Sequence, residues 1–180
     1  NPIYKDVVDA SELLTVNENA VSTLASQDYY TTVDGAAFAM REQMVNRDEN
    51  ITIFYSTTDE NYSQYMQMIA DEALSHTGAA RQGDYLKFQY AGWNCSLKGS
   101  VIEGTYYLQL DYVVTYYTTA EQEKQVDQKV DEILEQLDLR SKYNYEKITG
   151  VYDYICSHVT YDYDHLDDES YKLKYTAYAA

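Results

Sequence analysis

The most constraining feature of this sequence is a block of alternating apolar and polar residues between positions 83 and 117. The segments GDYLKFQY, WNCSLKG and TYYLQLDYVVTYY repeat this alternation and are separated by glycine-containing turns. Alternation with a period of two places apolar side chains on one face of a strand, and short glycine-containing connections join neighbouring strands. The block therefore predicts adjacent antiparallel strands of a small sheet.

The region before this block predicts helices and one more strand. Asp34 suits the N-cap of a helix that is expected to run to about Arg47. Its buried face is predicted to consist of Ala37, Met40 and Met44. Upstream, ENAVSTLASQDYY indicates an earlier helix, and downstream the β-branched run ITIFYS indicates a strand.

Two more helices are predicted from caps and apolar spacing. Asp59 is expected to cap a helix that stops before Gly78, and Thr118 with Glu121 forms a capping-box pattern that begins another. The apolar faces are Tyr62, Tyr65, Met66, Ile69 and Ala73 in the first helix, and Val126, Val130, Ile133, Leu134 and Leu137 in the second. Residues 1–140 therefore predict an α+β domain in which helices pack on a small antiparallel sheet.

The pattern restarts in residues 141–180. Asn144 is expected to cap a helix that runs to about His158. Its buried stripe is predicted to be Ile148, Val151, Tyr152, Ile155 and Val159. An acidic loop and a tyrosine-rich stretch follow. One helix and a loop cannot bury a core alone, so this part either leans on the first domain or begins an incomplete second one.

The charge balance limits the partners of this chain. There are 13 basic and 30 acidic residues, which gives a net charge of −17. Binding to nucleic-acid phosphates needs a basic surface, so no nucleic-acid partner is expected. No apolar run reaches the roughly 18 residues that a membrane span requires. The first residues lack the order of a secretory signal, so such a signal was either removed upstream or never present.

Tyrosine and cysteine usage also carry information. The chain has 22 tyrosines among 180 residues, which suits half-buried rings on sheet faces and, as an alternative, an exposed recognition surface. Cys95 and Cys156 lie far apart in the sequence. A single long-range disulfide would suit an exported protein, and two buried free thiols fit equally well.

The stretch YDYICSHVTYDYDH, residues 152–165, brings a cysteine, two histidines and three aspartates close together in sequence. Cys156 falls near the C-terminal end of its predicted helix, where the helix dipole disfavours a thiolate. His158 is two positions further on, and residues two apart on a helix do not face each other. We therefore interpret Cys156 as a packed structural cysteine and not as a nucleophile.

The histidines suggest no other site. His76 ends a predicted helix without an obvious carboxylate neighbour and is expected to be a surface residue. His165 lies among Asp162, Asp164, Asp167 and Asp168, but the glycine and glutamate of a calcium-binding loop are missing, so we expect a solvated acidic loop. The sequence assigns no catalytic, cofactor-binding or metal-ligating residues.

The last fifth of the chain resembles the entry segment of bacterial transglutaminase-like domains. In that family a helix with the pattern Tyr-Glu-Lys, then Tyr-Asp-Tyr-Ile, leads through a valine to a Tyr-Asp pair and later to Thr-Ala-Tyr-x-Ala. The matching positions are Tyr145, Glu146, Lys147, Tyr152, Asp153, Tyr154, Ile155, Val159, Tyr161, Asp162, Thr176, Ala177, Tyr178 and Ala180. Each element is ordinary, and their order and spacing together carry the resemblance.

The resemblance implies a papain-like core of which residues 141–180 are only the first helix and loop. The family's catalytic cysteine follows the Thr-Ala-Tyr-x-Ala stretch, and its histidine and aspartate come later, so no residue of this chain takes their roles. Residues 1–140 would be an accessory domain of an exported, cell-surface protein. The intact protein would act by thiol acyl transfer or peptide hydrolysis on a protein or a peptidoglycan peptide.

Two further expectations accompany this interpretation. The alternative function is a non-catalytic binding or adhesion module, whose tyrosine-rich acidic surface recognises a protein or a glycan. An incomplete core would also leave apolar surface exposed, so self-association of this chain is expected.

Overall fold

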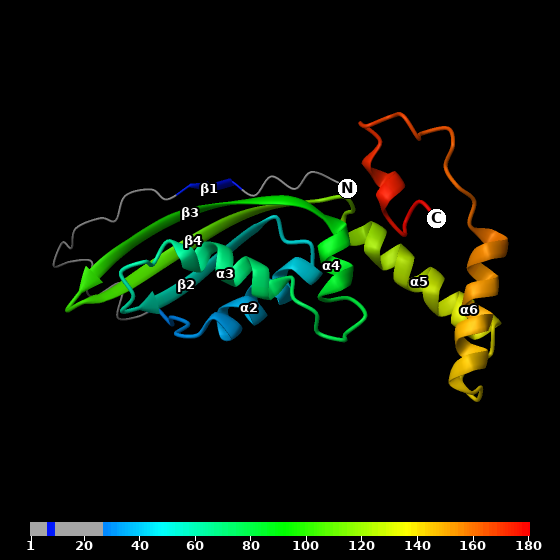
Figure 1. The fold of residues 1–180 in the computed structure, drawn as a ribbon, viewed down its shortest axis with the longest axis horizontal. Coiled ribbons are helices and arrows are strands. Elements are labelled where there is room, and N and C mark those ends of the chain that lie inside the picture. The colour runs from blue at the N-terminus through cyan, green and yellow to red at the C-terminus, as the bar shows by residue number, and fades with distance from the viewer. Residues whose placement is uncertain (1–6, 10–26) are drawn as a thin grey trace. The chain divides into compact units, whose positions relative to one another are not determined.

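The computed structural model describes residues 7–9 and 27–180, which form two compact units (Figure 1). The first unit ends at Tyr116, and the second is Tyr117–Ala180. This division precedes the predicted boundary at residue 140, so helix α5 (Ala120–Gln136) belongs to the second unit. The helix predicted upstream, at residues 18–30, lies largely outside the described residues. Its last residues are not helical, and Tyr30 forms a β-bridge with Tyr55.

The first unit is built on a four-stranded sheet with the order β1-β3-β4-β2. The long strands β2 (Asn50–Thr57), β3 (Tyr90–Ile102) and β4 (Thr105–Tyr116) are antiparallel. The short strand β1 (Val7–Asp9) pairs in parallel with β3. Together with its helices, this sheet confirms the α+β class.

One predicted strand is wrong, because GDYLKFQY forms helix α4 (Asp84–Gln89) and strand β3 begins only at Tyr90. Short apolar runs fit a strand or one helical turn equally well, and here Leu86 and Gln89, three residues apart, are the buried pair. The preceding Gly83 has a φ of +53°, and a Cβ there would lie 2.7 Å from the carbonyl oxygen of Ser75. Glycine is therefore needed at the entry to α4.

Helix α2 (Val33–Val45) follows its predicted pattern with a different cap. The Thr32 side chain accepts a hydrogen bond from the backbone of Gly35 at 3.2 Å, so Thr32 is the N-cap and Asp34 lies in the first turn. Its predicted buried face is confirmed, since Ala37, Met40 and Met44 are fully buried.

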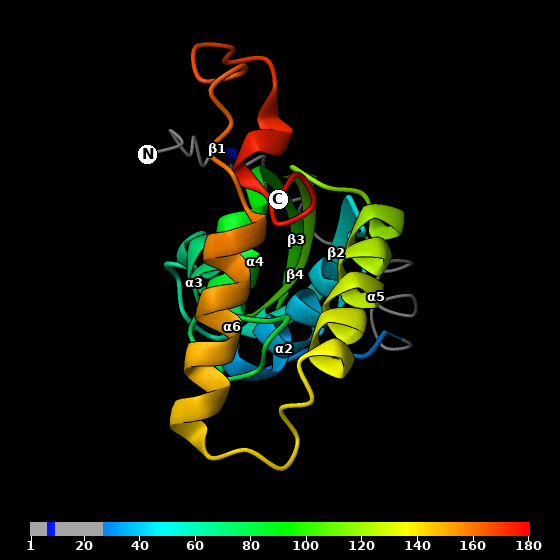
Figure 2. The ribbon, with the colours of Figure 1, turned by 90° about the vertical axis from the view of Figure 1, so that its right-hand side faces the viewer.

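Helix α3 (Gln64–Ala73) lies beside α2 on one face of the sheet (Figure 1; Figure 2). Its N-cap is Ser63; the predicted cap, Asp59, instead accepts hydrogen bonds from Asn61 and Gln64 in the preceding turn, both at 2.8 Å. The buried residues of α3 include Met66, Ile69 and Ala73, which confirms this part of the predicted face.

The core fills the space between these two helices and the sheet. Among the described residues, every buried hydrophobic side chain lies in the first unit. The largest members are Tyr112, Met40, Met44, Ile51, Ile53, Met66, Ile69, Leu86, Leu97, Leu108, Leu110 and Val114. The strand register brings Leu97 and Ile53 opposite Leu110, so apolar residues align across three strands.

A buried arginine joins the two helices. Arg41 of α2 donates from Nε to the carbonyl oxygen of Ala73 at 2.7 Å, and its Nη2 donates to the carbonyl oxygen of Glu72 and to Ser75 Oγ. The last carbonyl groups of a helix have no partners within the helix. Arg41 therefore supplies the donors that the C-terminal end of α3 requires.

The second unit contains α5, helix α6 (Asn144–His158) and the short 3₁₀ helix η1 (Lys172–Tyr175). The capping box of α5 is formed by Thr119 and Gln122, one position after the predicted pair of Thr118 and Glu121. The α6 helix begins at Asn144 and ends at His158, as predicted, but Asn144 is its first helical residue and not its cap. No helix in the described part of the chain is long and apolar enough to cross a membrane.

The apolar faces predicted to be buried in the second unit are half-buried or exposed, and this part of the prediction is wrong. Neither α5 nor α6 has a buried residue. The exposed fractions along α6 are 69% for Ile148, 66% for Tyr152, 50% for Ile155 and 39% for Val159. Helical periodicity identifies these faces correctly, but no element of the second unit covers them.

Candidate functional site

The cysteine of the 152–165 stretch lies on the surface. Cys156 is a free, exposed thiol near the C-terminal end of α6, so the prediction of a packed cysteine is wrong. The reason is that the apolar stripe beside it is itself uncovered. The thiol contacts Tyr152, one turn earlier, and hydrogen bonding to Cys156 raises the pKa of the Tyr152 phenol.

Both histidines of the stretch are engaged away from this thiol. The His158 ring stacks on Tyr154 with centroids 4.0 Å apart, and its Nδ1 lies 2.9 Å from the Tyr154 carbonyl oxygen. His165 stacks on Tyr171 at 4.0 Å, and its Nδ1 lies 2.9 Å from Asp162 Oδ2. A thiol nucleophile needs an imidazole within hydrogen-bond reach, so this arrangement does not activate Cys156.

Asp162 and His165 form a local hydrogen-bonded pair. Desolvation acts to raise the pKa of Asp162, but the side-chain and backbone hydrogen bonds from His165 together outweigh it and hold that pKa below its ordinary value. The Asp162 carboxylate therefore stabilises the turn of the acidic loop. In the described part of the chain, no group of three or more histidine, cysteine or acidic side chains is arranged to hold a metal ion.

The acidic loop is organised around an internal cation. The ammonium group of Lys174 donates hydrogen bonds to the carbonyl oxygens of His165, Leu166 and Asp168 at 2.8, 3.0 and 2.8 Å. Inward-facing carbonyl groups of this kind are also ligands for Ca²⁺ in proteins. Here the lysine ammonium group satisfies them.

The other two candidate residues lie in the first unit. His76 was expected to be a surface residue, and its exposed side chain confirms this; its Nδ1 lies 2.6 Å from Asp84 Oδ2, at the start of α4. Cys95 of β3 is a free, buried thiol, and desolvation raises its pKa to about 12. Cys95 is therefore unreactive at neutral pH.

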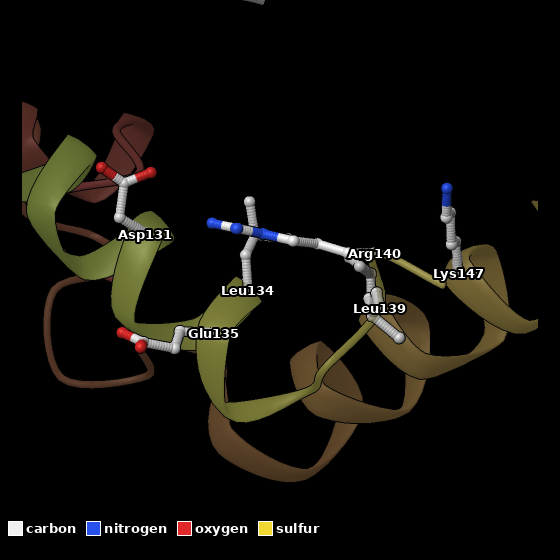
Figure 3. Close-up of a pocket in the computed structure, with 7 residues that line it drawn as sticks. Asp131, Leu134, Glu135, Leu139, Arg140 and Lys147 are labelled. Atoms are coloured by element: carbon white, nitrogen blue, oxygen red, sulfur yellow. The ribbon is translucent and has the colours of Figure 1, made fainter. Parts of the chain in front are cut away.

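Two pockets lie in the second unit. The first, which we call the α5–α6 pocket, has a volume of about 560 Å³ (Figure 3). It is lined by Asp131, Leu134, Glu135, Leu139, Arg140, Lys147 and Val151. The second, the C-terminal pocket, has a volume of about 620 Å³ and is lined by Ile155, Cys156, Val159, Thr160, Tyr161, Asp162, Leu166, Lys174, Tyr175, Thr176, Ala179 and Ala180.

The sequence reasoning missed the α5–α6 pocket. A signal for it exists, because Asp131, Leu134 and Glu135 are spaced three and four residues apart and share one helix face. Leu134 was predicted to lie in the core, and that prediction leaves no pocket beside Asp131 and Glu135.

Comparison with known proteins gives no further identification: no protein-family model, no curated protein and no solved structure matches this chain.

Proposed function

We propose that this chain is the N-terminal part of an exported, cell-surface transglutaminase-like protein. The first unit serves as an accessory domain, and α6 with the following loop begins the papain-like core. The intact protein acts by thiol acyl transfer or peptide hydrolysis on a protein or a peptidoglycan peptide.

The observation that carries this proposal is the exposed stripe of α6. Ile148, Tyr152, Ile155 and Val159 follow helical spacing, and each is at least 39% exposed. Three of them, Tyr152, Ile155 and Val159, also belong to the transglutaminase-like pattern. An exposed apolar stripe of this length calls for a covering element. The remainder of a papain-like core would provide that cover.

The proposed chemistry takes place outside the described residues. A cysteine thiolate attacks an amide carbonyl, the amine leaves with a proton, and an acyl-enzyme forms. A second amine or water then attacks the thioester and releases the thiol. The nucleophile would follow the stretch that ends at Ala180, whereas Cys156 occupies a variable helical position in the family pattern.

The test is the intact mass of the parent polypeptide, with the sequence after Ala180 read by tandem mass spectrometry. The proposal expects a longer parent with a cysteine in a glycine-flanked turn, followed by a histidine and an aspartate. In such a parent, Cys156→Ser should leave the incorporation of a fluorescent amine into casein unchanged, while replacement of the later cysteine should abolish it. A parent that ends at Ala180 would overturn the catalytic proposal.

A second candidate function is a non-catalytic binding module, and the exposed tyrosines favour it. Tyr143, Tyr145, Tyr161 and Tyr163 are between 65% and 83% exposed. Tyrosine is enriched in protein recognition surfaces because its ring offers a large contact area with a polar end. A parent with a complete core but without the cysteine, histidine and aspartate would support this candidate over the enzyme.

Self-association of the chain is part of the same proposal. The uncovered stripe of α6 is expected to pair with a second copy when no other cover is present. Light scattering at increasing concentration should show a rise in mean mass, and Ile148→Glu should reduce that rise. A monomer at every concentration would contradict it.

A further inference from the structure

The α5–α6 pocket has a charge distribution that the proposed function does not use. One wall comes from α5, where Asp131 and Glu135 are four residues apart and therefore project from the same face. Figure 3 shows both carboxylates on the α5 side, with Leu134 next to the end of the Arg140 side chain. Like charges at this spacing repel each other, so this wall favours a positively charged partner.

Another part of the pocket lining is basic. Lys147 of α6 and Arg140 of the connection between the helices supply it. In Figure 3, the Arg140 side chain extends back towards Leu134 of α5, and Lys147 projects from α6 on the far side. Two cations at one pocket stand out in a chain with 13 basic and 30 acidic residues. This wall favours a negatively charged partner, and arginine suits a carboxylate because its donors match both oxygens.

None of these four charged side chains forms a hydrogen bond or an ion pair within the part of the chain that the structure describes. By contrast, Lys129 and Glu132, also on α5, pair with each other at 3.4 Å. The pocket therefore keeps two carboxylates and two cations available to a ligand.

The floor between the charged walls is apolar. Leu134, Leu139 and Val151 form it. Leu139 is held against α6 because Gly150 has no side chain, and a Cβ at that position would lie 3.1 Å from Leu139 Cδ2. A volume of about 560 Å³ falls in the range of small-molecule pockets, which combine an apolar floor with a few polar groups.

We propose that the α5–α6 pocket binds a short zwitterionic peptide with an apolar side chain. The ammonium group of the peptide lies at Asp131 and Glu135, its carboxylate lies at Arg140 and Lys147, and its side chain covers the apolar floor. Charge complementarity at both ends fixes the orientation of the peptide. This site lies in the second unit and does not depend on the transglutaminase-like resemblance.

The test uses the full chain and the dipeptide leucyl-leucine as the probe, with binding followed by backbone amide chemical shifts. Saturable shifts are expected in α5, α6 and their connection, with a dissociation constant in the millimolar range or tighter. N-acetyl-leucyl-leucinamide has the same side chains without the two terminal charges. Its affinity should be lower by about tenfold or more, since both charged contacts are lost. Absence of shifts with leucyl-leucine, or equal binding of the blocked peptide, would overturn the proposal.

Variants locate the site. Arg140→Gln and Glu135→Gln should each weaken the binding of leucyl-leucine by about tenfold, because each removes one charged contact. Lys142→Gln and Glu132→Gln are the matched controls, since they remove the same charges from positions outside the pocket lining. The controls should stay within about twofold of the parent, as screened surface charges have small effects. Equal weakening by controls and pocket variants would show a non-specific charge effect and overturn the assignment.

Discussion

The two units of this chain use the same kind of apolar periodicity with opposite results. In the first unit, the helical faces of α2 and α3 meet the sheet and form a continuous core. In the second unit, which the structure describes throughout, the buried residues are Thr118 and Thr176 alone. Periodicity therefore predicts which face of a helix is apolar. It does not predict whether the chain also supplies a partner for that face.

Tyrosine shows the same contrast. In the first unit, Tyr112 is buried, packs edge-to-face on Trp93 with ring centroids 5.7 Å apart, and donates its hydroxyl to the carbonyl oxygen of Met66 at 2.9 Å. Tyr116 likewise donates to the carbonyl oxygen of Asp48 at 2.9 Å. In the second unit, Tyr143 is 83% exposed. The structural use of tyrosine that its abundance suggests is thus found in the first unit.

Thiol reactivity should separate the units most strongly. Burial raises the pKa of Cys95 from 9.0 to about 12, so the native thiolate fraction falls by about a thousandfold. A disulfide reagent at neutral pH should therefore label Cys156 rapidly and Cys95 only after unfolding. Cys156→Ser should remove the rapid phase. Fast labelling of Cys95 in that variant, under native conditions, would contradict the burial of the first unit.

Matched isoleucine truncations should give the next largest difference. Ile53 of β2 is 1% exposed, and Ile148 of α6 is 69% exposed. Ile53→Ala should lower the free energy of unfolding of the first unit by about 2–5 kcal/mol, because it removes buried methyl groups and leaves a cavity. Ile148→Ala should change it by less than about 0.5 kcal/mol, as expected for an exposed site. Urea unfolding measures both, and a large effect of Ile148→Ala would show that its stripe is covered in solution.

A smaller difference in stability is expected for two cationic side chains that donate to backbone carbonyl groups. Arg41 serves the end of α3, and Lys174 serves the acidic loop. Arg41→Met should cost about 1–3 kcal/mol of unfolding free energy, since buried carbonyl groups lose their donors. Lys174→Met should leave that transition unchanged and increase amide hydrogen exchange in residues 165–171. Equal effects on the main transition would show that the units unfold together.

The smallest expected effect is a loss of stability at alkaline pH, which the buried Cys95 thiol should cause. The folded pKa of Cys95 is raised above its ordinary value of 9.0, so its contribution to stability is complete below that pH. It is lost as the pH rises towards about 12, with a slope of about 1.4 kcal/mol per pH unit. Urea unfolding between about pH 9 and 10 should show this loss, before the tyrosine hydroxyls ordinarily titrate. Cys95→Ala should flatten the slope, and an unchanged slope would assign it to other groups.

Sequence reasoning succeeds where local chemistry decides and fails where distant chain segments decide. Ala37, Met40 and Met44 were predicted to be buried because their spacing is helical and a sheet is available. The caps were misplaced by one to four residues because Thr32, Thr119 and Ser63 compete with nearby side chains of similar chemistry. Which of these side chains becomes the cap depends on the local backbone geometry, and a short sequence pattern does not show that geometry.

Two contacts at the candidate sites could not be predicted for a related reason. His76 meets Asp84 only because the turn through Gly83 leads back into α4. The α5–α6 pocket requires the connection between the two helices to place Arg140 and α6 beside α5. These contacts depend on the course of the chain and not on a local motif.

The strand order of the first unit has a consequence for the time course of folding. Strands β3 and β4 are joined by the two-residue turn at Glu103 and Gly104, so they can pair within microseconds of meeting. Apart from the bridge at Tyr30, strand β2 in the described part of the chain pairs with β4, which is synthesised much later. During translation, β2 therefore waits with an open edge and apolar side chains, and this interval is when the nascent chain is most prone to aggregate.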